Sequence, residues 1–155
     1  MKVLLDLNVV LDVILNRQPF LADSLAVWNA QQSGEFEGFL ASTEFTNLFY
    51  IVERIAGNSA ARTAVSIVHF FRVAFRSMLS VCLNAFQVVA VDHMILKAAE
   101  SLSGTDFEDN VCIACAKSIA ADWIVTRDTT GFAQSSVPAI APADLMKRLA
   151  KSPSP

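Results

Sequence analysis

The sequence predicts a three-layer α/β fold in which a parallel sheet is covered by helices on both faces. Three observations support this prediction. Short apolar runs alternate along the chain with segments of helical periodicity, an order typical of a parallel sheet wrapped by its connecting helices. Residues 2–7 form an apolar run ending close to an acid, as expected of a strand buried on both faces. The 155 residues suffice for one domain, so we expect residues 1–150 to fold as a unit, with a flexible tail at 151–155.

Each predicted element has a local signal. The first strand leads directly into a helix ending near Asn16, and the Arg17-Gln18-Pro19 break precedes a second helix that is stopped by Ser33-Gly34. Ser42 opens the helix after the second strand, and Gly57-Asn58 is expected to close it. The predicted strands cover residues 2–7, 36–41, 88–91, 123–126 and 137–140. The predicted helices cover residues 8–16, 21–32, 42–56, 59–80, 92–102, 105–121 and a last segment from 142.

Composition and charge narrow the function classes. With 54% hydrophobic and 17% charged residues, the chain is more apolar than an ordinary soluble domain, so disorder is excluded and a buried partner surface is expected. A net charge of -3 argues against a protein that coats nucleic acid through bulk positive charge, but permits an enzyme that holds a phosphate backbone through metal ions. The uncharged stretch at 77–91 is too short to span a membrane. We expect a cytoplasmic protein with reduced cysteines, in which Cys112 and Cys115 are small buried helix residues.

Polar side chains gather after the predicted strands, at the edge where open α/β sheets bind ligands. The carboxylates and amides there are Asp6, Glu44, Asn47, Asp106, Glu108, Asp109 and Asp128. Several also have a structural explanation: Glu44 suits the first turn of a helix, Glu108 would form a capping box with Thr105, and Asp128 could start a turn. Asp6 resists such an explanation, because an unpaired carboxylate in a buried apolar strand is costly.

Together these acids favour a site for a hard metal ion. Oxygen ligands without histidine or paired cysteine nearby select magnesium or manganese over zinc. Two such ions, ~3.5–4 Å apart, can activate a water and stabilise the leaving oxygen of a phosphodiester. The reaction class that follows is hydrolysis of nucleic acid.

Four segments in order carry a resemblance to a known family. They are residues 3–16, 42–50, 106–116 and 124–132, with the sequences VLLDLNVVLDVILN, STEFTNLFY, DFEDNVCIACA and IVTRDTTGF. Over residues 1 to about 146 the chain resembles PIN-domain proteins, best known as VapC-like ribonuclease toxins.

The resemblance implies a doubly wound, five-stranded sheet of order 3-2-1-4-5. It also implies a metal-dependent endoribonuclease that hydrolyses RNA with Mg²⁺ or Mn²⁺ as cofactor and acts as the toxin of a toxin–antitoxin pair. By position, Asp6, Asp109 and Asp128 match the metal ligands, and Glu44 is expected to join them as a catalytic acid. The supporting residues are expected to be Asn8, Asn47, Asp106 and Thr126.

The second acid of the family is where this sequence departs. Many members have a Glu before Leu and an aromatic pair, and that register places Asn47 in the slot. Glu44 lies three residues earlier on the same helix face. Either Glu44 supplies the charge from one turn away, or the site has one carboxylate fewer and binds metal more weakly.

Basic and apolar residues suggest the partners. Arg127, next to Asp128, is the residue we expect to contact the RNA backbone. Apolar side chains at helical spacing in residues 67–78, together with those in 48–52, suggest a groove or dimer surface. By resemblance the partner is an identical subunit, forming a homodimer, an antitoxin protein whose segment blocks the acidic pocket, or both.

Two other functions stay open. In the first, the chain is a catalytically weakened PIN-like protein-interaction module, and Asn47 marks the weakened site. In the second, it is an aspartyl phosphotransferase with Asp6 as nucleophile, although position 8 lacks the second Asp of such a motif and no downstream Lys is evident. An Asp6→Asn substitution separates nuclease from module: cleavage and metal affinity collapse in a nuclease, whereas partner binding persists in a module.

Overall fold

The computed structural model describes residues 1–60 and 66–151, and the side chains of residues 1–54 and 76–151. These residues form a parallel sheet of five strands in the order β3-β2-β1-β4-β5. The strands are β1 (Lys2–Leu5), β2 (Glu37–Ala41), β3 (Gln87–Val89), β4 (Trp123–Val125) and β5 (Ala139–Ile140). The predicted fold class and strand order are confirmed.

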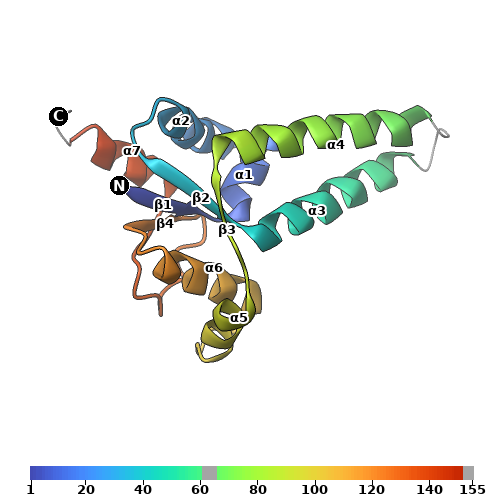
Figure 1. Ribbon diagram of the computed structural model, residues 1–155. Coiled ribbons are helices and arrows are strands. Elements are labelled where there is room, and N and C mark those ends of the chain that lie inside the picture. Colours follow the sequence, from blue (N-terminus) through green and yellow to red (C-terminus); the bar gives the residue numbers. More distant parts are fainter. Residues whose placement is uncertain (61–65, 152–155) are drawn as a thin grey trace.

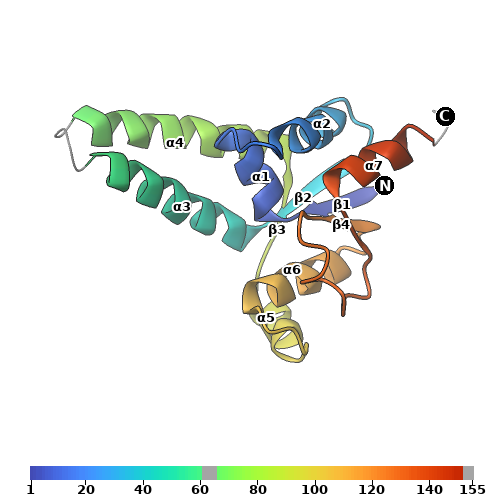
Figure 2. The same cartoon turned by 180° about the vertical axis from the view of Figure 1, so that it is seen from behind.

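Helices cover both faces of the sheet (Figure 1). They are α1 (Leu7–Ile14), α2 (Leu21–Gln32), α3 (Ser42–Ala60), α4 (Ser66–Ala85), α5 (His93–Glu100), α6 (Phe107–Ser118) and α7 (Pro142–Leu149). Helices α1, α2 and α7 lie on one side, and α5 and α6 lie on the other. Helices α3 and α4 run side by side and extend away from the sheet, which both views show (Figure 2).

Alternation along the strands divides the core into two hydrophobic layers. Val3 and Leu5 of β1 pack among residues of α1, α2 and α7, whereas Leu4 packs among those of α5 and α6. All three side chains are at most 1% exposed, and burying each stabilises the fold by ~1.5–3 kcal/mol. This double burial explains why the strands are apolar throughout and why the acid after β1 stands out.

Two helix boundaries differ from the sequence-based expectation. Helix α3 continues through the predicted Gly57-Asn58 stop to Ala60, where it runs beside α4, and α4 begins at Ser66 instead of residue 59. A glycine inside a helix costs only ~1 kcal/mol, which packing readily offsets. The predicted junction falls partly on residues 61–65, which lie outside the described residues.

The N-terminus of α6 also differs from the prediction. The helix begins at Phe107, and the Asp106 side chain caps it by accepting a hydrogen bond of 2.8 Å from the backbone N–H of Glu108. The predicted capping box of Thr105 and Glu108 is therefore wrong, because Asp106 occupies the capping position. Glu108 consequently loses its purely structural explanation.

The cysteines behave as predicted. Cys82, Cys112 and Cys115 are buried free thiols, and burial raises the pKa of Cys115 to about 11. Such thiols stay protonated at neutral pH and pack as small apolar groups. Within the described parts of the chain, we find no helix with the length and apolar character needed to cross a membrane.

Candidate active site

The fold brings acids from four segments to one edge of the sheet. Strand β1 lies between β2 and β4, so the residues that follow these three strands are neighbours. Asp6 follows β1, Glu44 lies in the first turn of α3 after β2, and Asp128 follows β4. Asp109 comes from the first turn of α6. The sequence placed these four acids at this edge, and the structure has them there.

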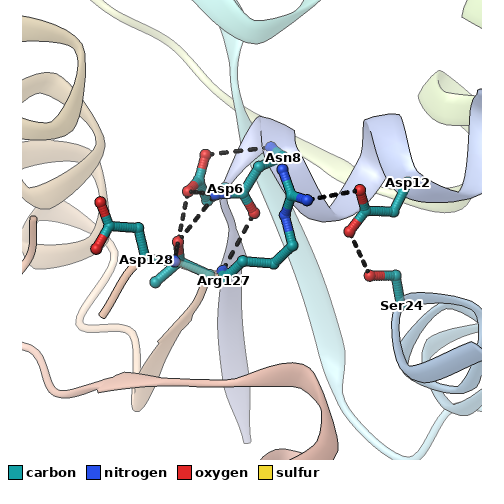
Figure 3. A network of polar contacts seen from close by, with 7 residues as sticks. Asp6, Asn8, Asp12, Ser24, Arg127 and Asp128 are labelled. Atoms are coloured by element: carbon teal, nitrogen blue, oxygen red, sulfur yellow. Dashed lines mark hydrogen bonds and ion pairs between the residues drawn. The ribbon is translucent and has the colours of Figure 1, made fainter. Parts of the chain in front are cut away.

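Asp6 joins strand and helix. It is the N-cap of α1 and accepts a hydrogen bond from the backbone N–H of Asn8 at 3.3 Å. The Asn8 amide and the Thr126 hydroxyl also donate to its Oδ2, the latter at 2.6 Å (Figure 3). Burial nevertheless raises the pKa of Asp6, while the bonds from Thr126 and Asn8 and the charge of Arg127 oppose the rise. The carboxylate is thus held in one orientation by several donors.

Thr126 is the centre of this network. Its side chain is fully buried, and its hydroxyl donates to Asp6 while accepting from the Asn8 amide at 3.1 Å and from the backbone N–H of Asp128 at 3.0 Å. A hydroxyl has one proton and two lone pairs, so all of its bonding capacity is used. Thr126 therefore ties the residue after β1 to the residues after β4, and the supporting role of Thr126 and Asn8 stays a prediction.

Asp109 and Asp128 approach each other at Gly131. A Cβ atom on Gly131 would lie 2.6 Å from Asp109 Oδ2 and 3.6 Å from Asp128 Oδ2. The other oxygen of Asp128 accepts from the backbone N–H groups of Thr130 and Gly131 at 3.1 and 3.3 Å. A glycine thus leaves the room into which both carboxylates project.

These two acids have opposite pKa shifts. Hydrogen bonds from Thr130 and Gly131 hold the pKa of Asp128 below its usual range. Burial raises the pKa of Asp109 to about 6, and the negative charges of Asp106, Asp6, Asp128 and Glu108 add to the rise. The charged form of Asp109 is thus destabilised first by burial and then by the neighbouring acids.

The charged form of Glu44 is strongly disfavoured by its surroundings. The residue is 3% exposed, and its Oε2 has no hydrogen-bond partner. Burial, together with the charges of Glu108 and Asp6, raises its pKa to about 8. An ionised carboxylate in this position needs a positive partner, since burying an unpaired charge is costly.

Asn47, on α3, links this helix to α6. Its amide donates to Glu108 Oε1 at 2.9 Å, and a hydrogen bond from Asn47 also opposes the rise in the pKa of Glu44. Burial raises the pKa of Glu108, and Asp106 and Asp6 add to the rise. Glu108 is thus a fifth acid of this group, which the sequence analysis placed at this edge but assigned to helix capping and not to the candidate site. Its place in the first turn of α6, beside Asp109, was the available signal.

The Arg127 side chain points away from these acids, toward α1. Its Nη1 lies 3.3 Å from Asp12 Oδ1 (Figure 3). The guanidinium also stacks on the Phe20 ring, at 4.3 Å from the ring centroid. Asp12 in turn accepts a hydrogen bond from Ser24 at 3.0 Å. The sequence did not single out Asp12, Phe20 or Ser24, because no local pattern indicates that these residues contact Arg127 or one another.

The donor set suits a hard divalent cation. All the candidate ligands are carboxylate oxygens, and the Glu44 oxygen lacks a partner. Burial, with added repulsion from neighbouring acids, raises the pKa of Glu44 and Asp109. Within the described residues, no three acidic, histidine or cysteine side chains are drawn together as a closed set of metal ligands. The charges of Asp6 and Asp109 nevertheless raise the pKa of Glu44, and those of Asp6 and Asp128 raise that of Asp109, so these acids lie within electrostatic range of one another.

The sequence identifies the family. The PIN domain family model matches residues 2–130, so the chain belongs to the PIN domain family. PIN domains are generally nucleases and typically use divalent metal ions. No curated protein matches the chain significantly.

Solved structures share the fold. A chain of FitAB bound to the IR36 DNA fragment is 17% identical, with a TM-score of 0.64 over 91% of this chain and 95% of that one. FitAcB from Neisseria gonorrhoeae gives 18% identity and a TM-score of 0.62, covering 90% and 97%. VapBC2 from Rickettsia felis, bound to a DNA fragment from their promoter, gives 12% and 0.59, covering 91% and 98%. Nearly the whole of each chain is thus built on one architecture.

Proposed function

We propose that the protein is a metal-dependent endoribonuclease and the toxin of a toxin–antitoxin pair. The observation that carries the proposal is the buried, unpartnered oxygen of Glu44 at a sheet edge where Asp6, Asp109 and Asp128 also lie. Such a concentration of carboxylates is costly to maintain by itself and is stabilised by a bound cation. Membership of the PIN family supports nuclease chemistry for this cation site.

In this proposal Asp6, Asp109 and Asp128 hold Mg²⁺ or Mn²⁺, and Glu44 completes the negative charge. The ion, when bound, activates a water and stabilises the leaving oxygen of the phosphodiester. Thr126 and the Asn8 amide hold Asp6 Oδ2 in place by donating to it. Backbone N–H groups hold Asp128 in the same way. Proton loss from Glu44 and Asp109 accompanies metal binding, because both have raised pKa values.

The partners are proposed from the family and the similar structures. RNA is the substrate by resemblance to ribonuclease toxins, and an antitoxin protein is the partner because the similar structures include the FitAB and VapBC2 complexes, captured with DNA. A homodimer and a cytoplasmic location complete the proposal. Arg127 as an RNA-backbone contact stays a prediction from the sequence.

The test is cleavage of a mixed single-stranded RNA by purified protein in Mn²⁺, in Mg²⁺ and in chelator. We expect cleavage with the metals alone and a loss of more than about 100-fold in an Asp6→Asn, Asp109→Asn double variant, since substitutions even beyond the ligands cost ~10–100-fold. A folded wild-type protein, freed of bound inhibitor, that cuts nothing in any metal would contradict the proposal.

Single variants settle which side chain provides the second acid. We expect Glu44→Gln to weaken cleavage and Mn²⁺ binding more than Asn47→Ala, because Glu44 is the charged and unpartnered group while Asn47 is bonded to Glu108. Equal losses in both variants would contradict the assignment of Glu44 as the second acid. No detectable cleavage or Mn²⁺ binding by the folded wild type would instead favour the weakened interaction module, the second candidate, whose specific support is the amide in the acid slot of the family.

A further inference from the structure

A partly buried charge cluster lies behind the acidic site, in which the Arg127 side chain is 27% exposed and Asp12 is fully buried. Asp12, in the second turn of α1, is 0% exposed. Its two oxygens face Arg127 Nη1 at 3.3 Å and Ser24 Oγ at 3.0 Å. The Phe20 ring covers the guanidinium at 4.3 Å. The cluster therefore joins α1 and α2 to the residue after Thr126.

Stability alone does not explain this cluster. A buried ion pair adds little net stability, because desolvation of both charges offsets their attraction. This pair is also incompletely bonded: Arg127 Nε is buried without a hydrogen-bond partner. Apolar side chains would fill the same space at a lower free-energy cost, so the pair is expected to have a role other than stability.

The backbone of Arg127 belongs to the acid network. Its N–H donates to Asn8 Oδ1 at 3.3 Å, while its side chain is held by Asp12. The two anchors restrain the peptide unit between Thr126 and Asp128 from both ends. Thr126 Oγ1 is thereby presented to Asp6 at 2.6 Å and to the N–H of Asp128 at 3.0 Å.

Electrostatics point the same way. The charge of Arg127 opposes the rise in the pKa of Asp6, whereas the charges of other acids raise the pKa of Glu44 and Asp109. Figure 3 shows the Arg127 guanidinium directed to Asp12, with the carboxylate of Asp128 on the opposite side. The positive charge of the guanidinium thus favours the ionised form of Asp6, although the side chain is directed to Asp12.

We propose that Asp12 and Arg127 are a positioning pair that fixes Thr126 and Asp128 against Asp6, so that metal binding at the site depends on two residues that do not touch the metal. The part concerning metal rests on the proposed function above. The part concerning geometry does not, and the two can be measured separately.

The geometric part is tested by amide hydrogen exchange, followed by NMR in the metal-free protein. We expect protection of the Arg127 and Asp128 amides to fall about 10-fold in Asp12→Asn and in Arg127→Lys, which retains the charge but loses the planar donor geometry of Arg. The matched control is Arg148→Met. It removes another guanidinium stacked on an aromatic ring, Trp123 at 4.7 Å, at the other end of β4.

The metal part is tested by titrating Mn²⁺ into the same variants and by steady-state RNA cleavage. We expect the Mn²⁺ dissociation constant to rise ~10–100-fold, and kcat to fall with KM for RNA nearly unchanged, in Asp12→Asn and Arg127→Lys but not in Arg148→Met.

Three outcomes overturn or divide the proposal. Unchanged amide protection and unchanged Mn²⁺ affinity overturn it. Weaker RNA binding with a salt slope reduced by ~1 and normal Mn²⁺ affinity also overturns it, because Arg127 would then contact a phosphate. Reduced protection in a protein whose wild type binds no Mn²⁺ upholds the positioning pair and refutes the proposed function instead.

Discussion

Single residues determine whether the carboxylates at this edge of the sheet can bind an ion together, and Gly131 is the clearest example. An added Cβ would meet Asp109 Oδ2 at 2.6 Å, a distance that real Cβ contacts do not reach. The atom that must move is the end of a flexible side chain, so the fold can adjust while the carboxylate cannot stay in place.

We therefore predict that Gly131→Ala changes the melting temperature little but weakens Mn²⁺ binding by ~10-fold or more, because it displaces Asp109 away from Asp128. Isothermal titration with Mn²⁺ measures the effect. Thr129→Ala, an exposed position in the same loop, is the control and should bind as the wild type does. Wild-type affinity in Gly131→Ala would show that Asp109 is not a ligand.

Replacing Glu44 is expected to raise the stability of the metal-free protein but to weaken the binding of metal. The pKa of Glu44 is raised to about 8, mainly by burial, so at pH 9 the metal-free wild type must carry a buried charge. We expect Glu44→Gln to raise the melting temperature at pH 9 in chelator by several degrees, since ~1 kcal/mol corresponds to ~2–4 °C at this size. The same variant should lose most of the stabilisation that Mn²⁺ confers. Thermal melts with and without Mn²⁺ check both, and a lower melting temperature in chelator would contradict the assignment.

At the scale of elements, close packing of helices on the sheet holds the strand ends in register. Gly38 of β2 faces Gln31 of α2 and Phe86 beyond α4, and a Cβ there would lie 2.7 Å from Gln31 Cγ and 2.9 Å from Phe86 Cδ1. Phe86 is buried and also packs edge-on against Trp28 at 4.9 Å. Gln31 is half-buried, and its side-chain amide donates a hydrogen bond to the backbone carbonyl of Ala85, so moving it would break this bond.

Gly38→Ala is accordingly expected to destabilise the fold by ~1–3 kcal/mol, the usual range for overpacking. Urea denaturation measures it. Mn²⁺ affinity per folded molecule should remain within about 2-fold of wild type, because the strain lies on the α2 side and does not involve the acids. A large loss of affinity at full stability would show that β2 transmits strain to Glu44.

Sequence patterns predicted the elements well because strands buried on both faces are apolar and the connecting helices carry clear breaks. The edge of the sheet followed from that order, and with it the location of Asp6, Glu44, Asp109 and Asp128. Boundaries set by tertiary contacts were not predictable, as α3 shows by running past Gly57 beside α4.

Contacts between distant segments were also beyond the sequence. The Asp12–Arg127 pair joins residues 115 positions apart, and neither residue type marks the other as its partner. Glu108 was set aside for the opposite reason. A local capping role accounted for it in the sequence, but in the structure Asp106 is the N-cap of α6. Sequence reasoning therefore named the acids and, by resemblance, Asn8 and Thr126 beside Asp6, but not the Asp12–Arg127 pair behind them.

At the scale of the whole molecule, the acidic region couples metal binding to pH and stability. Glu44 and Asp109 have pKa values raised to about 8 and about 6, so the folded protein retains protons that the unfolded chain, with ordinary values near 4.5 and 3.8, releases. Unfolding free energy must then decrease as pH rises from about 4 to 8. The lowered pKa of Asp128 acts in the opposite direction, but below this window.

We predict that in chelator the melting temperature falls between pH 5 and pH 8, and that saturating Mn²⁺ reverses this slope. The reversal follows because the cation binds the deprotonated carboxylates, so its affinity rises as Glu44 and Asp109 lose their protons, and its binding energy adds to the stability of the folded state alone. Differential scanning fluorimetry across this range, with and without Mn²⁺, provides the measurement, and the Asp6→Asn, Asp109→Asn variant is the control that should show little Mn²⁺ effect at any pH. Parallel slopes with and without the ion would mean that Mn²⁺ binds elsewhere, and the raised pKa values would then be a cost of the fold that no cation relieves.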